Sequence, residues 1–300
     1  MTAQRGVHRM DAVAMVVAII GVSFSGPLMA GTVTASAIAI AFWRTALGAG
    51  ATAPLVWRER GLLRALPRRS LWQTVGAGLF LAAHFATWIP SLHFTSIAAA
   101  TTLVCTQVVW AAIGDRLAGQ RAPRMMWAGI TIALVGAVTL TGIDFSLEPR
   151  ALVGDLLAVA GAIFAAGYYF LGQRARAHVP ANTYSLLVYL VAAGALAIVA
   201  LAGAVPLSGF AARDWWLILG VTVFAQIGGH SMLNLALRSF GATTISLALL
   251  LEIPGAVLVG WVWPGQAPSW QLFPAIALIL AGLVVVLRAE KPVDVVDPQS

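Results

Sequence analysis

The sequence predicts an all-α integral membrane protein of ten transmembrane helices, arranged as two inverted five-helix repeats. Three observations lead to this fold class: an apolar composition, ten apolar runs of spanning length, and basic residues that concentrate on one side of those runs. Of the 300 residues, 60% are hydrophobic and only 10% are charged, whereas a soluble domain carries about a quarter charged residues. A chain with so little polar surface has to face lipid.

Ten segments reach the length of a membrane helix, roughly 20 mostly apolar residues. The connections between them are short, and none could form a separate soluble domain. We expect the first segment to be retained, because its apolar run is longer than the core of a usual signal peptide. The expected spans are 12–30, 35–57, 71–91, 95–115, 124–142, 151–172, 183–204, 214–236, 241–262 and 270–287.

The basic residues separate by side when ten spans are assumed. Of the 18 Lys and Arg residues, all but three lie at the chain ends or in the loops that follow even-numbered spans. The exceptions are Arg150 and Arg213 on the other side and Arg44 within the second span. Because cytoplasmic loops are enriched in Lys and Arg, both termini are expected in the cytoplasm. The net charge of +7 reflects this topology, so membrane lipid is an expected partner and nucleic acid is not.

The two halves of the chain, residues 1–147 and 148–300, are similar in sequence and are interpreted as an internal repeat. At an offset of 146 residues, His84 aligns with His230. The turn after the fourth span reads GQRAPRMMW, and its counterpart after the ninth reads GQAPSW, without the arginines. Five spans per copy is an odd number, so the second copy enters the membrane inverted and its turn faces outward. The loss of the arginines agrees with that orientation.

Several motifs fit one known family. The second span contains AFWRTA, and the fourth and ninth spans open with SIAAATTL and ATTISLAL. The ninth contains EIP, and the fifth and tenth contain GITIALVGAV and ALILAGLVVV. With these motifs, the chain resembles the EamA-type branch of the drug/metabolite transporter superfamily over nearly its whole length. It departs from the family at the turns after spans 4 and 9, where Gln120 and Gln266 replace a frequent Glu.

This resemblance implies a secondary transporter and no enzyme. Many members of the branch export amino acids or related metabolites, and the overall pattern is most similar to the aromatic and broad-specificity amino-acid exporters of bacteria. We therefore expect amino-acid export across the bacterial inner membrane by alternating access through a central midplane cavity. Export of other metabolites or drugs is the alternative. No cofactor is expected, and the oligomeric state stays open.

Two ionisable residues lie within apolar spans, where charge is costly and usually faces a cavity or a partner. Arg44 lies about a third of the way into the second span, and Glu252 lies in the middle of the ninth. They are candidates for binding the carboxylate and the amino group of a substrate. Structural contacts are the alternative for both, and Glu252, beside Pro254, is also a candidate carrier of a coupling proton.

The paired histidines, His84 and His230, are candidates for substrate contact or proton relay, and interior hydrogen bonding explains them equally well. They lack carboxylate or thiolate neighbours, so no metal site is expected. Pro90 and the Gly228-Gly229 pair predict bends in the same two spans.

The remaining candidates for a substrate pocket are aromatic and amide side chains inside spans. Aromatic residues there more often serve packing, whereas buried amides need partners and are better markers of a cavity. These aromatic and amide candidates are Trp88, Gln107, Trp110, Tyr168, Tyr169, Gln226 and Asn234.

A membrane enzyme or a channel is the competing interpretation of the chain. No HExxH, GxSxG or P-loop motif and no selectivity filter is present in the sequence, so the transporter interpretation is favoured.

Overall fold

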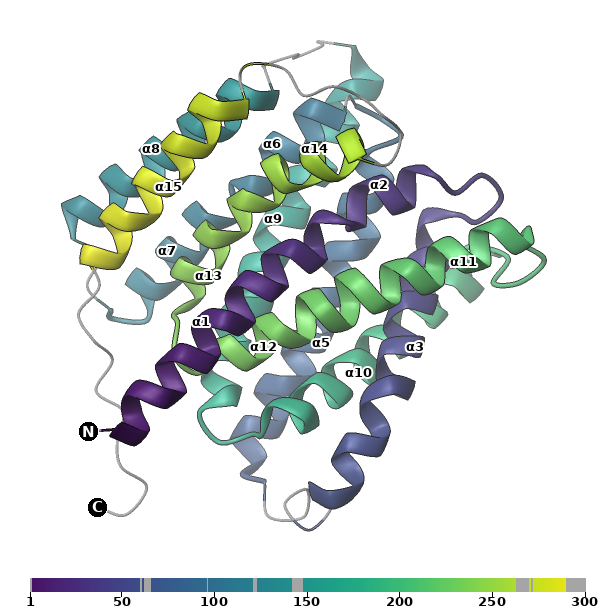
Figure 1. Cartoon of the computed structure of the whole chain (residues 1–300). Coiled ribbons are helices and arrows are strands. Elements are labelled where there is room, and N and C mark those ends of the chain that lie inside the picture. Colours follow the sequence, from purple (N-terminus) through teal and green to yellow (C-terminus); the bar gives the residue numbers. More distant parts are fainter. Residues whose placement is uncertain are drawn as a thin grey trace.

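The computed structural model describes residues 2–59, 61, 66–95, 97–120, 123–141, 148–262, 270 and 272–289, and within them it contains helices and no strands (Figure 1). The all-α prediction is confirmed for these residues. The elements of the first half are α1 (Thr2–Ser23), α2 (Ser25–Ala30), α3 (Ala37–Val56), η1 (Trp57–Glu59), α5 (Arg68–Ser91), α6 (Ile97–Cys105), α7 (Gln107–Leu117) and α8 (Arg124–Thr141).

The second half begins with α9, whose first residue is proline, a residue suited to a helix start because its missing N–H has no partner there anyway. Figure 1 shows α1 and α15 running in opposite directions, so the start of α1 and the end of α15 lie toward the same side. The elements are α9 (Pro149–Arg176), α10 (Ala181–Ala202), α11 (Ala212–Val221), η2 (Thr222–Ser231), α12 (Met232–Ala236), α13 (Ala242–Ala248), η3 (Leu249–Leu251), α14 (Glu252–Val262) and α15 (Leu272–Ala289).

Joined across their breaks, the described elements form ten helical segments in the predicted order. Six of these segments are long and apolar enough to cross a membrane by length and composition. They are Met10–Met29, Pro149–Arg176, Ala181–Ala202, Ala212–Ala236, Ala242–Val262 and Leu272–Ala289.

The other four segments coincide with the expected spans 35–57, 71–91, 95–115 and 124–142, and each departs from a plain apolar helix. Helix α3 contains Arg44, and α5 begins with two arginines. The fourth segment is divided at Thr106, and the described apolar part of α8 covers Arg124–Thr139. Ten membrane spans therefore stay a prediction, while six segments meet the requirement outright.

Helix packing repeats between the halves. Helix α1 packs against η2, and its counterpart α9 packs against α5, the counterpart of η2. In the same way α14 packs against α1, and α7 packs against α9. Two further pairs join counterparts directly, α3 with α10 and α8 with α15, and the fourth and ninth segments contact each other through α7 and α13. Apart from this last contact, exchanging the two halves maps each of these contacts onto one that is also present, as expected for two copies related by a twofold axis.

Helices α8 and α15 lie side by side at one edge of the molecule (Figure 1) and approach each other through glycines. A Cβ atom added to Gly129 would lie 2.7 Å from the carbonyl oxygen of Gly282, and one added to Gly282 would lie 2.5 Å from that of Gly129. Backbone therefore contacts backbone here, as small residues permit in membrane helix pairs.

Three of the ten helical segments, the first, fourth and ninth, are interrupted, and the eighth contains wider π-helical turns. Pro254 has no N–H to bond the carbonyl of Leu250 four residues earlier, and a 3₁₀ turn over Leu249–Leu251 precedes the new helix, whose first residue is Glu252. The fourth segment breaks at Thr106, the position aligned with Glu252 at the offset of 146. The first segment breaks at Phe24.

The bend predicted at Gly228-Gly229 appears as a π-helical segment, Thr222–Ser231. A Cβ on Gly229 would lie 2.6 Å from Val22, and one on Gly21 would lie 2.5 Å from the Phe224 carbonyl. Glycines on both sides thus let α1 cross close to the wide π turns. In α5 the proline is less disruptive, since the helix ends one residue later, at Ser91.

Candidate functional site

The site is built around Arg44 of α3, whose side chain is only 1% exposed. Its Nε donates a hydrogen bond to Oε1 of Gln226 at 2.8 Å, and its Nη1 donates to Oγ of Ser25 at 3.3 Å. The guanidinium carbon lies 4.4 Å from the centre of the Phe85 ring. Arg44 therefore joins segments 1, 2, 3 and 8, and these two bonds use two of the five N–H donors of its guanidinium.

Gly48 makes the approach of segment 8 possible. It lies four residues after Arg44, on the same helix face. A Cβ there would lie 2.8 Å from Cγ of Gln226 and 3.4 Å from the ring of Tyr189. The absence of a side chain at Gly48 lets the Gln226 amide reach Arg44.

Glu252 is the second charge of the site and belongs to the other half of the chain. Its charge acts on Arg44 and on Tyr169. Its side chain is half-buried, and among the described residues its carboxylate forms no hydrogen bond and no ion pair within 4.0 Å. Arg44 and Glu252 are therefore close enough to interact electrostatically, and they do not form an ion pair.

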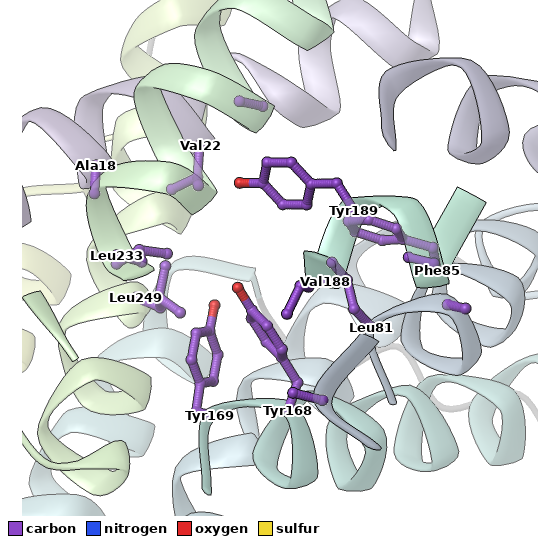
Figure 2. Packing of buried hydrophobic residues seen from close by; sticks show 14 of the residues in the cluster. Ala18, Val22, Leu81, Phe85, Tyr168, Tyr169, Val188, Tyr189, Leu233 and Leu249 are labelled. Atoms are coloured by element: carbon purple, nitrogen blue, oxygen red, sulfur yellow. The ribbon is translucent and has the colours of Figure 1, made fainter. Parts of the chain in front are cut away.

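The π-helical segment carries a second group of polar contacts. The Tyr189 hydroxyl donates to the carbonyl oxygen of Gln226 at 3.1 Å and lies 2.9 Å from Oγ of Ser231. Ser231 also reaches that carbonyl, at 3.4 Å. Figure 2 shows the hydroxyls of Tyr168, Tyr169 and Tyr189 directed toward one central region.

The two histidines have different environments, although they occupy the same position in the repeat. Nδ1 of His84 bonds the Gly161 carbonyl at 2.9 Å, and its ring stacks on Trp88 with 5.7 Å between centres. The His230 ring lies against Phe85 and Tyr168, and its Nδ1 is buried with no partner among the described residues. His84 thus has the interior hydrogen bond that the sequence allowed, while His230 keeps a free ring nitrogen.

Tyr168 and Asn234 bond each other. The tyrosine hydroxyl donates to Oδ1 of Asn234, whose Nδ2 donates to Oγ of Ser185 at 3.0 Å. Arg176 donates from Nε to the Asn234 carbonyl at 2.7 Å. This network joins segments 6, 7 and 8, and it occupies both amide atoms of Asn234.

The other candidates carry unused polar atoms or lie at a helix break. Nε1 of Trp88, Nε1 of Trp110 and Nε2 of Gln226 are buried without a hydrogen-bond partner among the described residues. Gln107 is a buried residue at the first position of α7. Groups of three or more potential metal ligands are absent from the described part of the chain.

The cluster is closed in this conformation. Gln226 and Tyr189 are fully buried beside Arg44. Two cavities, of about 330 and 510 Å³, lie elsewhere: one is lined by Met10 and other apolar residues, and the other by Pro54, Leu55, Glu59 and Asn182. The predicted central cavity does not coincide with either of them.

Four residues of the cluster were not among the sequence candidates. Ser25 precedes Gly26-Pro27, a helix-breaking pair that marks the break beside it. Tyr189 and Ser231 gave no signal beyond a hydroxyl in an apolar segment, and Phe85 gave none.

The comparisons with known proteins place this chain in a family. The model of the EamA-like transporter family matches residues 9–142 and again residues 152–288. These two matches cover most of the chain, which therefore belongs to the EamA-like transporter family. It is a multi-pass membrane protein with two repeats, in a family of small-molecule transporters rather than enzymes.

Solved structures agree with the fold. A crystal structure described only as that of a protein superimposes with a TM-score of 0.77 at 20% sequence identity, covering 94% of this chain and 99% of the other. At that identity the likeness shows the fold alone. No curated protein matches the sequence.

Proposed function

We propose that this protein exports amino acids across the bacterial inner membrane. In this proposal the two inverted halves, with both chain ends in the cytoplasm, open alternately to each side. One observation carries the substrate assignment: the buried Arg44 of the first half and the half-buried Glu252 of the second interact electrostatically, and they do not form an ion pair with each other.

A zwitterionic amino acid complements this pair. Its carboxylate would bind the guanidinium of Arg44 by charge-assisted hydrogen bonds, and its ammonium group would bind the carboxylate of Glu252. Each charge of the site would then be neutralised by the substrate, which removes the cost of leaving it unpaired in a low-dielectric interior. Because the two anchors belong to different halves, the bound substrate bridges the surfaces that alternating access separates.

The aromatic side chains around the anchors support a broad or aromatic specificity. Phe85 and Tyr169 lie beside the charges, and Trp88 stacks on His84 one turn of α5 away. Flat rings accept apolar side chains of different shapes without fixed polar contacts. The unpaired Nε1 groups of Trp88 and Trp110 are donors for a polar substituent such as a hydroxyl. Another zwitterionic metabolite or drug would use the same anchors and is the alternative cargo.

The test is counterflow in proteoliposomes. Vesicles preloaded with unlabelled amino acid receive labelled threonine, methionine or phenylalanine outside, without an ion gradient. We expect internal substrate to accelerate uptake of at least one of them. Arg44→Met should lower the rate about tenfold or more, because one charge-assisted hydrogen bond contributes about 1.5–3 kcal/mol.

Protein-free vesicles and an exposed-loop variant, Ser208→Ala, are the controls. Folded protein that takes up none of the three compounds would exclude the amino-acid assignment. Full activity of a folded Arg44→Met variant would remove Arg44 from the binding site.

A further inference from the structure

We infer that Gln226 occupies the place of the substrate carboxylate on Arg44 and that the substrate displaces it. This inference rests on the proposed function and deepens it, because it names the carboxylate as the group on which selection depends. In the empty carrier the amide oxygen of Gln226 holds the guanidinium. In the loaded carrier a carboxylate oxygen takes over that bond.

The geometry of the Gln226 side chain supports a temporary partner. Its Oε1 accepts from Nε of Arg44 at 2.8 Å, while its Nε2 is fully buried and has no partner among the described residues. A buried amide with only one end bonded loses free energy relative to one bonded at both ends. A carboxylate presents the same acceptor atom to a guanidinium, and it adds a charge and a second oxygen for a two-point contact. Substrate therefore competes favourably for Arg44.

The backbone around Gln226 supports a change of position. Gln226 lies inside the π-helical segment Thr222–Ser231, and π turns are rare elements that occur mostly at functional sites. Its carbonyl oxygen bonds the hydroxyls of Tyr189 and Ser231. When a π turn reverts to α, the wide turn no longer accommodates its extra residue, and the side chains on one side of it rotate by about 100° relative to the other. Such a change would withdraw the amide from Arg44.

The contact between Arg44 and Gln226 also joins the two halves, which move relative to each other when the carrier reorients. Arg44 belongs to the first half and Gln226 to the second, so their bond holds the halves together in the closed, empty state. This bond raises the barrier to reorientation of the empty carrier, and a substrate carboxylate that displaces the amide lowers it. Uncharged and decarboxylated analogues lack the group that displaces the amide.

The decisive variant is Gln226→Glu, which places a carboxylate permanently on Arg44. Charge-assisted hydrogen bonds are roughly twice as strong as neutral ones. The substrate carboxylate would therefore no longer bind Arg44 more strongly than the side chain at position 226 does. We expect phenylalanine counterflow to fall by about tenfold, the factor that corresponds to about 1.4 kcal/mol, while the thermal unfolding temperature of the purified protein rises. Gln173→Glu is the matched control. Gln173 also joins two segments, the sixth and the ninth, since its Oε1 accepts from the Ala242 N–H at 3.1 Å, and a carboxylate keeps that bond.

Gln226→Met covers the case in which the glutamate variant fails to fold. It keeps the length of the side chain and removes the competing oxygen, so we expect the half-saturating phenylalanine concentration to fall several-fold. Phenethylamine, which lacks the carboxylate, should not compete with phenylalanine in any variant.

The two proposals fail in different arms of this experiment. Absence of counterflow in the wild-type protein with every amino acid tested would exclude the amino-acid assignment. An active wild type with an equally active, folded Gln226→Glu variant would overturn the role of Gln226, as would a Gln226→Met variant with an unchanged half-saturating concentration.

Discussion

Asp214 shows how a single carboxylate can fix a loop between the two halves. It is 1% exposed and accepts hydrogen bonds from the backbone N–H groups of Val33, Thr34 and Ala35 and from the Thr34 hydroxyl, at 2.6–3.2 Å. Three successive N–H groups form a concave anion-binding site. The loop between α2 and α3 is thereby attached to the first turn of α11.

Asp214→Asn should therefore destabilise the protein. The amide has one acceptor oxygen instead of two, and its NH₂ group would face backbone donors, so we expect a loss of about 1–3 kcal/mol. Thermal unfolding in detergent measures it. Asp155→Asn is the control, because Oδ1 of Asp155 is buried without a partner among the described residues and should tolerate loss of its charge. An equal loss in both variants would contradict this role of Asp214.

The residues of the site could be predicted from sequence to the extent that their chemistry was unusual for their surroundings. Arg44 and Glu252 were recognisable as charges within apolar runs, and Gln226 as a buried amide. The difference between His84 and His230 could not be predicted, since it depends on the Gly161 carbonyl, which belongs to a distant helix. Whether any of these residues contacts substrate stays a prediction.

At the scale of elements, irregular helices were predictable only where proline or glycine caused them. Pro254 indicated the break before Glu252, and the Gly228-Gly229 pair indicated a bend, although not a π helix. The break at Thr106 has no such signal. Its hydroxyl bonds the Leu103 carbonyl at 2.6 Å, a local contact that competes with the helix ladder but does not by itself require a break.

The α8–α15 pair provides a prediction of its own. Gly282→Ala would place a methyl group 2.5 Å from the Gly129 carbonyl oxygen, so the helices must separate and lose packing contacts. We expect the unfolding temperature to fall. Gly194→Ala is the matched control in α10, where a Cβ meets nothing within 4 Å; alanine is the better helix former there and should leave stability unchanged or raise it. The same decrease in both variants would exclude close packing as the cause.

At the scale of the whole molecule, hydropathy and charge together led to the predicted topology. The apolar runs predicted ten spans, and the side-to-side distribution of arginines agreed with that number, although only six of the described segments meet a length and hydropathy criterion by themselves. Two of the other four contain polar residues inside an apolar helix, Arg44 in α3 and His84 in α5. Membrane segments that line a polar interior are those in which a hydropathy criterion fails first.

Cysteine labelling in intact cells tests this topology. The chain has one cysteine, Cys105, which is buried and should give little background. With ten spans and a cytoplasmic N-terminus, Ser208→Cys should react with a membrane-impermeant maleimide outside. Leu117→Cys, at a position 83% exposed, should react only after the membrane is permeabilised. Reaction of both positions in intact cells would contradict the ten-span arrangement.

The two aligned helix breaks have a kinetic consequence. The same position of the repeat carries a hydroxyl at Thr106 and a carboxylate at Glu252. A carrier of two inverted halves interchanges the environments of these positions each time it reorients. If every pair of aligned positions carried identical residues, the inward and outward half-reactions would be mirror images and would have equal rate constants. With one neutral and one acidic residue at this pair they differ, so the half-saturating substrate concentrations on the two sides of the membrane differ. Equal concentrations on both sides still give no net flux.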